Sequence, residues 1–136
     1  MKIEKRYLVR KIADEQTIVP CRVSLTDWKP GDELLLLNYE HHPVDSPYRM
    51  RFAIFVRRGE ETYDEVDKMP EQLRSRMLAV RAFDAKAMLL AFELELVDGR
   101  ELESAIERVF NNQAAAYLHV HYAAPGCYAA RVDRVA

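Results

Sequence analysis

The hydrophobic positions of this chain fall into short runs and alternating stretches that are separated by polar and turn-forming segments. Residues 17–25 alternate between apolar and polar side chains, whereas 34–37 and 51–56 are apolar throughout or nearly so. Alternation is typical of a half-buried strand, and a short continuous run is typical of a strand buried on both faces. We therefore predict a strand over 17–25 and two central, buried strands over 34–37 and 51–56.

Two later segments contain good helix formers but lack a helical spacing. Met, Leu, Ala and Glu are frequent over 78–84 and 88–97, and these residues favour helices. Over 88–97, however, apolar side chains recur at every second position, with Glu93 and Glu95 between them. A period of two indicates a strand, so we expect 78–84 and 88–97 to form a hairpin.

Two helices are predicted. The longer one covers 99–112, where Asp98 can cap the first turn and one apolar stripe is formed by Leu102, Ile106, Val109 and Phe110. A short helix over 70–77 begins at Pro70, because proline is tolerated at the first helical position.

A hairpin built from 117–122 and 127–135 closes the chain, which brings the total to about seven strands and one substantial helix. Most connections are too short for crossover helices. We therefore predict an α+β fold with a mainly antiparallel sheet, one face of which the long helix covers. The 136 residues contain no internal repeat and no linker-like tract, which indicates a single domain over 1–136.

Composition and charge narrow the classes of function. The formal net charge is −2, with both signs scattered along the chain, so we expect neither nucleic acid nor a membrane as a partner. The N-terminal residues contain no apolar run of signal-peptide length. Cys21 and Cys127 are too few for a disulfide scaffold. We therefore expect a cytoplasmic protein with both cysteines reduced.

The first candidate for chemistry is the polar segment 38–49, which we expect to be a long loop directly after the buried strand. Polar groups at the end of a rigid strand can be held in fixed geometry at the rim of the core. Their mixture suits a small polar or anionic ligand, and the candidate binding residues are Asn38, Tyr39, His41, Ser46, Tyr48 and Arg49. The alternative is a solvated loop whose side chains bond to turn backbone.

The second candidate is the pair His119 and His121, which lie two residues apart on a predicted strand and so share a face. Two imidazoles can bind zinc together with a third ligand. The neighbouring sequence offers no third ligand, and the alternative is simply the more polar face of a sheet. We therefore expect no bound metal and no other cofactor.

The third candidate is Cys127 as a nucleophile. A reactive thiolate needs a nearby cation, a histidine or a helix N-terminus. Cys127 begins a predicted strand, so a small buried apolar residue is the alternative. Phosphate loops and the signatures of zinc proteases, serine hydrolases and kinases are absent from the sequence, which leaves any catalytic residue unassigned.

The register of the terminal hairpin decides whether these groups can form one site. A four-residue turn over 123–126 would pair Tyr122 with Cys127 and place Arg131 among apolar side chains. We expect instead a three-residue turn that ends with Gly126 in the left-handed conformation. The polar face then carries Tyr117, His119, His121, Cys127, Arg131 and Asp133, and the apolar face Leu118, Val120, Tyr128, Ala130 and Val132. We expect His41 and Arg49 to approach the polar face and complete a ligand site.

Several strings match a family pattern, and NYEH and GCYAARVDR are the most specific of them. The matching segments are PCRVSL (20–25), LLLNYEHHPVDSPYR (35–49), IFVR (54–57), LRSRMLAVRAFDA (73–85), LESAIERVF (102–110) and YLHVHYAAPGCYAARVDR (117–134). Together they closely resemble a bacterial family known as domain of unknown function 1203, over most of the chain from residue 17. Typical members have a longer N-terminal segment and an Asn where this chain has Tyr122. The resemblance implies a bacterial cytoplasmic protein and implies no activity or cofactor.

Three functions follow as hypotheses. The leading one is a small-ligand-binding domain, with or without catalysis, that uses the 38–49 segment and the terminal hairpin. The second is a non-catalytic interaction or homodimerisation module that uses an exposed strand edge or aromatic face. The third is a mononuclear metal protein that uses His119 and His121.

Overall fold

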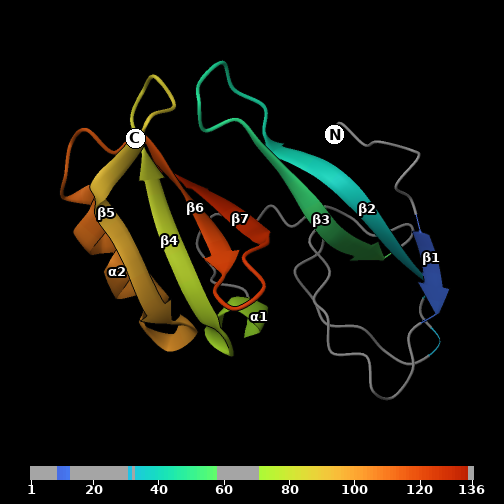
Figure 1. The fold of residues 1–136 in the computed structure, drawn as a ribbon. Coiled ribbons are helices and arrows are strands. Elements are labelled where there is room, and N and C mark those ends of the chain that lie inside the picture. Colours follow the sequence, from blue (N-terminus) through green and yellow to red (C-terminus); the bar gives the residue numbers. More distant parts are fainter. Residues whose placement is uncertain (1–8, 13–30, 32, 58–70, 135–136) are drawn as a thin grey trace.

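In the part of the chain that the structure describes, seven antiparallel strands form two sheets, and one helix covers the larger of them (Figure 1). The computed structural model describes residues 9–12, 31, 33–57 and 71–134. The predicted strand over 17–25 and Cys21 lie outside these residues. The α+β class with mainly antiparallel pairing is confirmed, although the strands are divided between two sheets.

The smaller sheet has the strand order β1-β2-β3, from β1 (Val9–Ile12), β2 (Glu33–His42) and β3 (Met50–Arg57). The predicted strand 34–37 is the first half of β2, and the prediction that a loop begins at residue 38 is wrong. Residues 38 and 39 pair with Ala53 and Phe52, and His42 pairs with Met50. The strand therefore continues through its polar half and ends at His42, directly before the first proline of the loop.

The prediction that β3 is buried on both faces is also wrong. Ile54 and Val56 are buried, whereas the alternate residue Ala53 is exposed and Phe52 is 45% exposed. Among the described strands β3 pairs with β2 alone, so it lies at an edge of the sheet and not at its centre. An apolar run does not show whether a second layer is present to cover it.

The larger sheet has the order β5-β4-β6-β7 and contains both predicted hairpins. Its strands are β4 (Met77–Phe83), β5 (Leu89–Asp98), β6 (Tyr117–Tyr122) and β7 (Tyr128–Asp133). The period of two over 88–97 thus prevails over the helix-forming composition, because tertiary pairing with β4 overrides local helix propensity.

The long helix begins with a 3₁₀ turn, η2 (Gly99–Glu101), and continues as α2 (Leu102–Phe110). The Asp98 side chain accepts a hydrogen bond from the Arg100 backbone N–H, which confirms the predicted cap. The predicted short helix is shorter than expected: α1 covers Glu71–Arg74, because the chain enters β4 at Met77. No helix among the described residues has the length and apolar character needed to cross a membrane.

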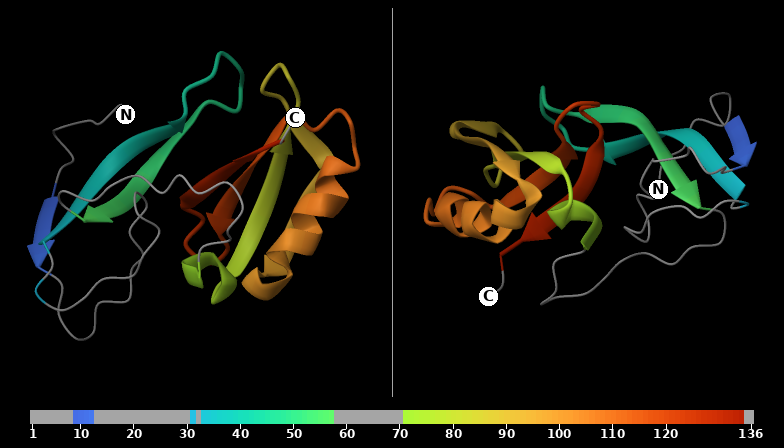
Figure 2. Two further views of the ribbon diagram at one scale, coloured as in Figure 1. Left: turned by 180° about the vertical axis from the view of Figure 1, so that it is seen from behind. Right: turned by 90° about the horizontal axis from the view of Figure 1, so that it is seen from below.

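The helix α2 lies along one face of the larger sheet (Figure 2), and the main hydrophobic core lies between them. It contains buried residues of β4, β6 and the helix, among them Leu78, Val80, Leu102, Val109, Leu118 and Val120. Because strand side chains alternate, the residues between these on β4 and β6 point to the opposite face. The last residues of β2 and the first residue of β3 lie against that opposite face.

Candidate functional site

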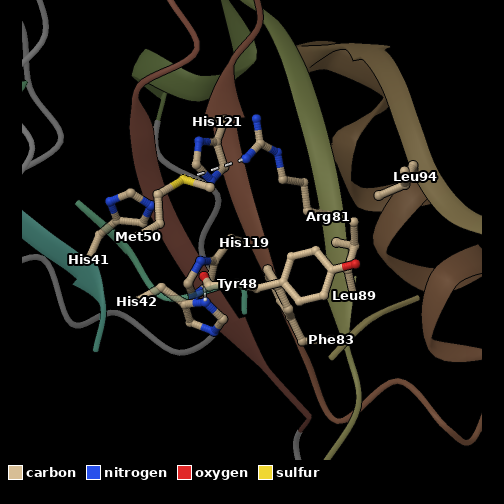
Figure 3. Close-up of a pocket in the computed structure, with 10 residues that line it drawn as sticks. All are labelled: His41, His42, Tyr48, Met50, Arg81, Phe83, Leu89, Leu94, His119 and His121. Atoms are coloured by element: carbon tan, nitrogen blue, oxygen red, sulfur yellow. Dashed lines mark hydrogen bonds between the residues drawn. The ribbon is translucent and has the colours of Figure 1, made fainter. Parts of the chain in front are cut away.

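All four histidines of the chain meet between the end of β2 and the face of β6 (Figure 3). His119 and His121 alternate on β6 with the core residues Leu118 and Val120, and His41 and His42 are the last residues of β2. None of the four is more than 6% exposed. The ring centroids of His41 and His121 are 5.4 Å apart, and those of His42 and His119 are 4.8 Å apart.

A bulge in β2 brings both of its terminal histidines to this cluster. Tyr39 pairs with Phe52 and His42 with Met50, so two residues of β2 oppose Arg51 alone. Without the extra residue, His42 would share a face with Asn38 and Glu40. With it, His42 lies on the face of Tyr39 and contacts His119.

Hydrogen bonds divide the four imidazoles into two groups. His42 is fully engaged, since its Nδ1 lies 2.8 Å from the Tyr48 carbonyl and its Nε2 lies 2.7 Å from the Tyr117 hydroxyl. The Nδ1 of His121 lies 2.9 Å from the Gly126 carbonyl. A carbonyl can only accept, so Nδ1 carries the proton in both rings and Nε2 is an acceptor.

The other two imidazoles retain unused hydrogen-bonding capacity. The Nδ1 atom of His41 is buried and has no hydrogen-bond partner in the described part of the chain. Within residues 33–57 and 71–134, His119 likewise has no hydrogen-bond partner, although its ring contacts six other aromatic rings. These nitrogen atoms, with the Nε2 of His121, are available to a bound molecule.

Burial keeps His41, His119 and His121 neutral. It is the largest cause that lowers the pKa of His41 and of His121 to about 4 and that of His119 to about 2. Neighbouring histidines and the Arg81 or Arg131 guanidinium lower the three pKa values further. At neutral pH each ring can therefore accept one hydrogen bond and donate another.

The histidines line a cavity of about 210 Å³. Its other walls are Tyr48 and Met50 from the β2–β3 hairpin, Arg81 and Phe83 from β4, and Leu89 and Leu94 from β5. Arg81 is half-buried and stands opposite His119 in the sheet register. Figure 3 shows its guanidinium directed towards Met50, whose sulfur lies 3.9 Å from the nearer nitrogen.

The terminal hairpin combines the two registers considered for it. The turn 123–126 has four residues, with Tyr122 N–H donating to the Cys127 carbonyl, so the predicted three-residue turn is wrong. Ala129 is then an extra residue in β7, and beyond this bulge His119 faces Arg131 as predicted. Gly126 has the predicted left-handed conformation, with φ of 78°. Because of the bulge, the hairpin has a four-residue turn and still places His119 and Arg131 on the same face.

Two residues of this hairpin lie on the opposite face from that predicted. Cys127 belongs to the hydrophobic core with Leu118 and Val120, which places it outside the cavity. Tyr128 pairs with His121, and its ring stacks on His41 at 5.0 Å between centroids. Both residues precede the bulge in the chain. The four-residue turn alone therefore decides which face of the sheet each side chain points to.

The remaining predicted residues are partly at the site. Tyr48 lines the cavity. Tyr39 packs edge-on against Tyr128. Ser46 donates to the Ala87 carbonyl at 2.9 Å and so fixes the loop, and Asn38 accepts a hydrogen bond from Arg51. The prediction that Arg49 reaches the histidines is wrong, because it pairs with Glu40 at 2.8 Å.

Arg131 shares a face with His119 but does not line the cavity. Its Nε lies 2.9 Å from Asp133, and its guanidinium lies over the Tyr117 ring at 4.1 Å. Sequence reasoning missed several cavity residues, namely His42, Met50, Arg81, Phe83, Leu89 and Leu94. Arg81 alone carried a signal, because it is a charge within an otherwise apolar strand, on the face opposite to the buried Val80 and Ala82.

The described residues contain no group of three or more His, Cys, Asp and Glu side chains arranged to hold a metal ion. The metal hypothesis for His119 and His121 therefore gains no support from the geometry. Elemental analysis of the purified protein tests it directly.

Comparison with known proteins gives one match. Residues 18–134 match the family described as Protein of unknown function (DUF1203), and the chain belongs to this family. No curated protein and no solved structure matches it.

Proposed function

We propose that this member of the DUF1203 family binds a small molecule in the cavity between the end of β2 and the face of β4 and β6. The observation that carries the proposal is the burial of all four histidines around one cavity, with the Nδ1 of His41 unpaired. A buried polar group without a partner costs about 1–3 kcal/mol. A cluster needed only for packing would be apolar, so a ligand that bonds to these groups explains their retention.

The cavity has the composition of a ligand site. Its walls are mostly aromatic and aliphatic, and a few polar groups converge on it: neutral imidazoles, the Tyr48 phenol and the Arg81 guanidinium. Its volume of about 210 Å³ is below the ~300–1,000 Å³ of sites for drug-sized molecules, so the ligand is small. Tyr48, Met50 and Arg81 are half-buried, which connects the cavity to the surface.

Histidine NMR offers a direct test, because every imidazole of the chain belongs to the cluster. Protein with ¹³C,¹⁵N-labelled histidine is titrated with small metabolites that raise its melting temperature. We expect a true ligand to shift the ring signals of His41, His119 and His121. The variant His119→Gln should lose binding, whereas Ser104→Ala, an exposed change on α2, should retain it.

Ligands that stabilise the protein without moving any histidine signal would bind elsewhere and contradict the proposal. So would His119→Gln protein that folds and binds as tightly as the parent chain.

A second candidate function, homodimerisation, is favoured by the exposed apolar side chains of β5. Phe92 is fully exposed and Leu96 is 70% exposed, while Glu93 and Glu95 on the other face bond to Asn112 and Arg108 of the α2 region. β5 pairs only with β4 among the described strands, and an exposed apolar edge strand is a surface for pairing.

We propose that, if this surface has a partner, the partner is a second copy of β5 that extends the sheet across a two-fold axis. Sedimentation equilibrium should then give a dimer that Phe92→Glu dissociates. Gln113→Glu adds the same charge at an exposed loop position and should leave the dimer intact. A monomer at all concentrations would exclude this candidate.

A further inference from the structure

On the premise that the cavity binds a small molecule, we propose that its ligand is a monocarboxylate. The carboxylate would bond to the Arg81 guanidinium, and the apolar part of the molecule would lie against Phe83, Leu89 and Leu94.

Arg81 differs from the other arginines whose side chains the structure describes. Among residues 33–57 and 71–134 it has no acidic side chain within ion-pair distance, and its one hydrogen-bonding contact there is to the Met50 sulfur, a weak acceptor. The others pair with carboxylates or backbone carbonyls: Arg10, Arg49, Arg51, Arg74, Arg100, Arg108 and Arg131 with Asp or Glu, and Arg76 and Arg134 with carbonyls.

The position of Arg81 makes this lack of a counter-charge costly. Its side chain is half-buried, and burial lowers its pKa without an acidic neighbour to oppose the effect. A guanidinium nevertheless stays charged in proteins. Within the described residues no Asp or Glu lines the cavity, so the only full charge on its walls is positive. A bound anion would supply the missing partner.

The charge and shape of the site favour a carboxylate over other anions. One guanidinium beside neutral imidazoles balances a single negative charge, whereas a phosphate dianion would leave one charge uncompensated in a poorly solvated site. The planar fork of arginine matches the two oxygens of a carboxylate. The free nitrogen atoms of His41 and His119 can supply further hydrogen bonds to the ligand.

The apolar half of the cavity indicates that the acid carries a hydrocarbon group. Phe83 is buried, Leu89 is half-buried and Leu94 is 46% exposed although it lines the cavity. A ring or short chain attached to the carboxylate would cover Leu94 and gain contact with all three. The small volume limits this group to roughly the size of one ring.

The experiment compares acids with their neutral and cationic analogues. Benzoate, phenylacetate and hexanoate are each titrated at pH 7.5 beside the corresponding amide and amine, with phenyl phosphate as the second anion. Calorimetry gives Kd, and the histidine ring signals identify the cavity as the site. We expect at least one acid to bind there about tenfold or more tighter than its amide, because a hydrogen bond to a charged group is lost in the amide.

Three variants locate the charge that matters. Arg81→Gln should weaken acid binding about tenfold or more and leave amide binding unchanged, which also shows that the variant is folded. Arg81→Lys keeps the charge but loses the fork, and should give an intermediate affinity. Arg131→Gln removes a charge on the same sheet face, outside the cavity, and should change Kd less than about threefold.

Several results would overturn the inference. They are equal affinity for acid and amide, tighter binding of phenyl phosphate than of any acid, or equal losses in Arg81→Gln and Arg131→Gln. If no acid reaches the cavity while neutral metabolites do, the carboxylate inference fails and the proposed function stands. If no compound of either screen moves a histidine signal, both fail.

Discussion

Lowering the pH from 7 to 5 is predicted to destabilise this protein strongly, through the buried histidines. In the unfolded chain each imidazole titrates near its ordinary value of 6.5, whereas in the folded chain burial holds the pKa of His41 and His121 at about 4 and that of His119 at about 2. Below pH 6.5 the unfolded chain therefore binds protons that the folded chain does not. The contribution of these three histidines to the free energy of unfolding is therefore fully present above pH 6.5 and is lost as the pH falls towards their folded pKa values.

The expected loss follows from the linkage between protonation and folding. Each pH unit below 6.5 costs about 1.4 kcal/mol per histidine until the folded pKa is reached. At pH 5 this is about 2 kcal/mol for each of the three histidines, or about 6 kcal/mol together. A typical domain has about 5–15 kcal/mol of stability, so the chain should be close to its acid unfolding midpoint near pH 5.

Urea unfolding followed by circular dichroism at pH 7.5, 6.5, 5.5 and 5.0 measures this loss. His119→Phe removes one titrating ring that has no hydrogen bond to replace, so about 4 kcal/mol should be lost by pH 5 instead of about 6. Ser104→Ala should keep the full dependence. A free energy of unfolding that falls by less than about 2 kcal/mol between pH 7.5 and 5.0 would refute the reasoning. Titration of the His41, His119 and His121 rings near pH 6.5 in the folded protein would refute it equally.

Three further substitutions test individual contacts by urea unfolding. A Cβ on Gly99 would lie 1.8 Å from the Leu73 carbonyl oxygen, so Gly99→Ala should cost about 3 kcal/mol, and a neutral effect would contradict the close packing of η2 on α1. Gly126→Ala meets no atom within 4 Å and should cost only the ~1 kcal/mol of its left-handed backbone, which makes it the control. Tyr117→Phe leaves the Nε2 of His42 without its partner and should cost about 1–3 kcal/mol, whereas unchanged stability would show that this hydrogen bond contributes nothing.

Local periodicity was sufficient to predict most elements of the described fold. The alternation over 88–97 identified β5 in spite of its helix-forming residues, and Asp98 marked the start of the helix. Such signals depend only on residues within one segment, so they can be recognised without knowing the tertiary contacts. What periodicity cannot show is which layer covers a face. The apolar side of β5 is therefore exposed at Phe92 and Leu96, although its pattern resembles that of a buried strand.

Sequence reasoning named several residues of the candidate site but did not predict how they are arranged. His41, His119 and His121 do lie together as expected, although His41 belongs to β2 and not to the predicted loop. His42 was missed, since strict alternation from Tyr39 places it on the opposite face of β2. Arg81 was missed because its neighbour His119 comes from a strand that is distant in sequence.

The two bulges explain both the errors and the site itself. Each inserts one residue, at Glu40–His41 in β2 and at Ala129 in β7. Side chains beyond the inserted residue then point to the opposite sheet face from the one that strict alternation would give them. Regular strands would place His42 away from the cluster and Arg131 in the core. An extra residue leaves no mark in the periodicity of its own strand, because it is defined only by the partner strand. The bulge in β2, which the sequence alone could not predict, is therefore what adds His42 to the other three histidines, and the bulge in β7 is what places Arg131 on the face of His119.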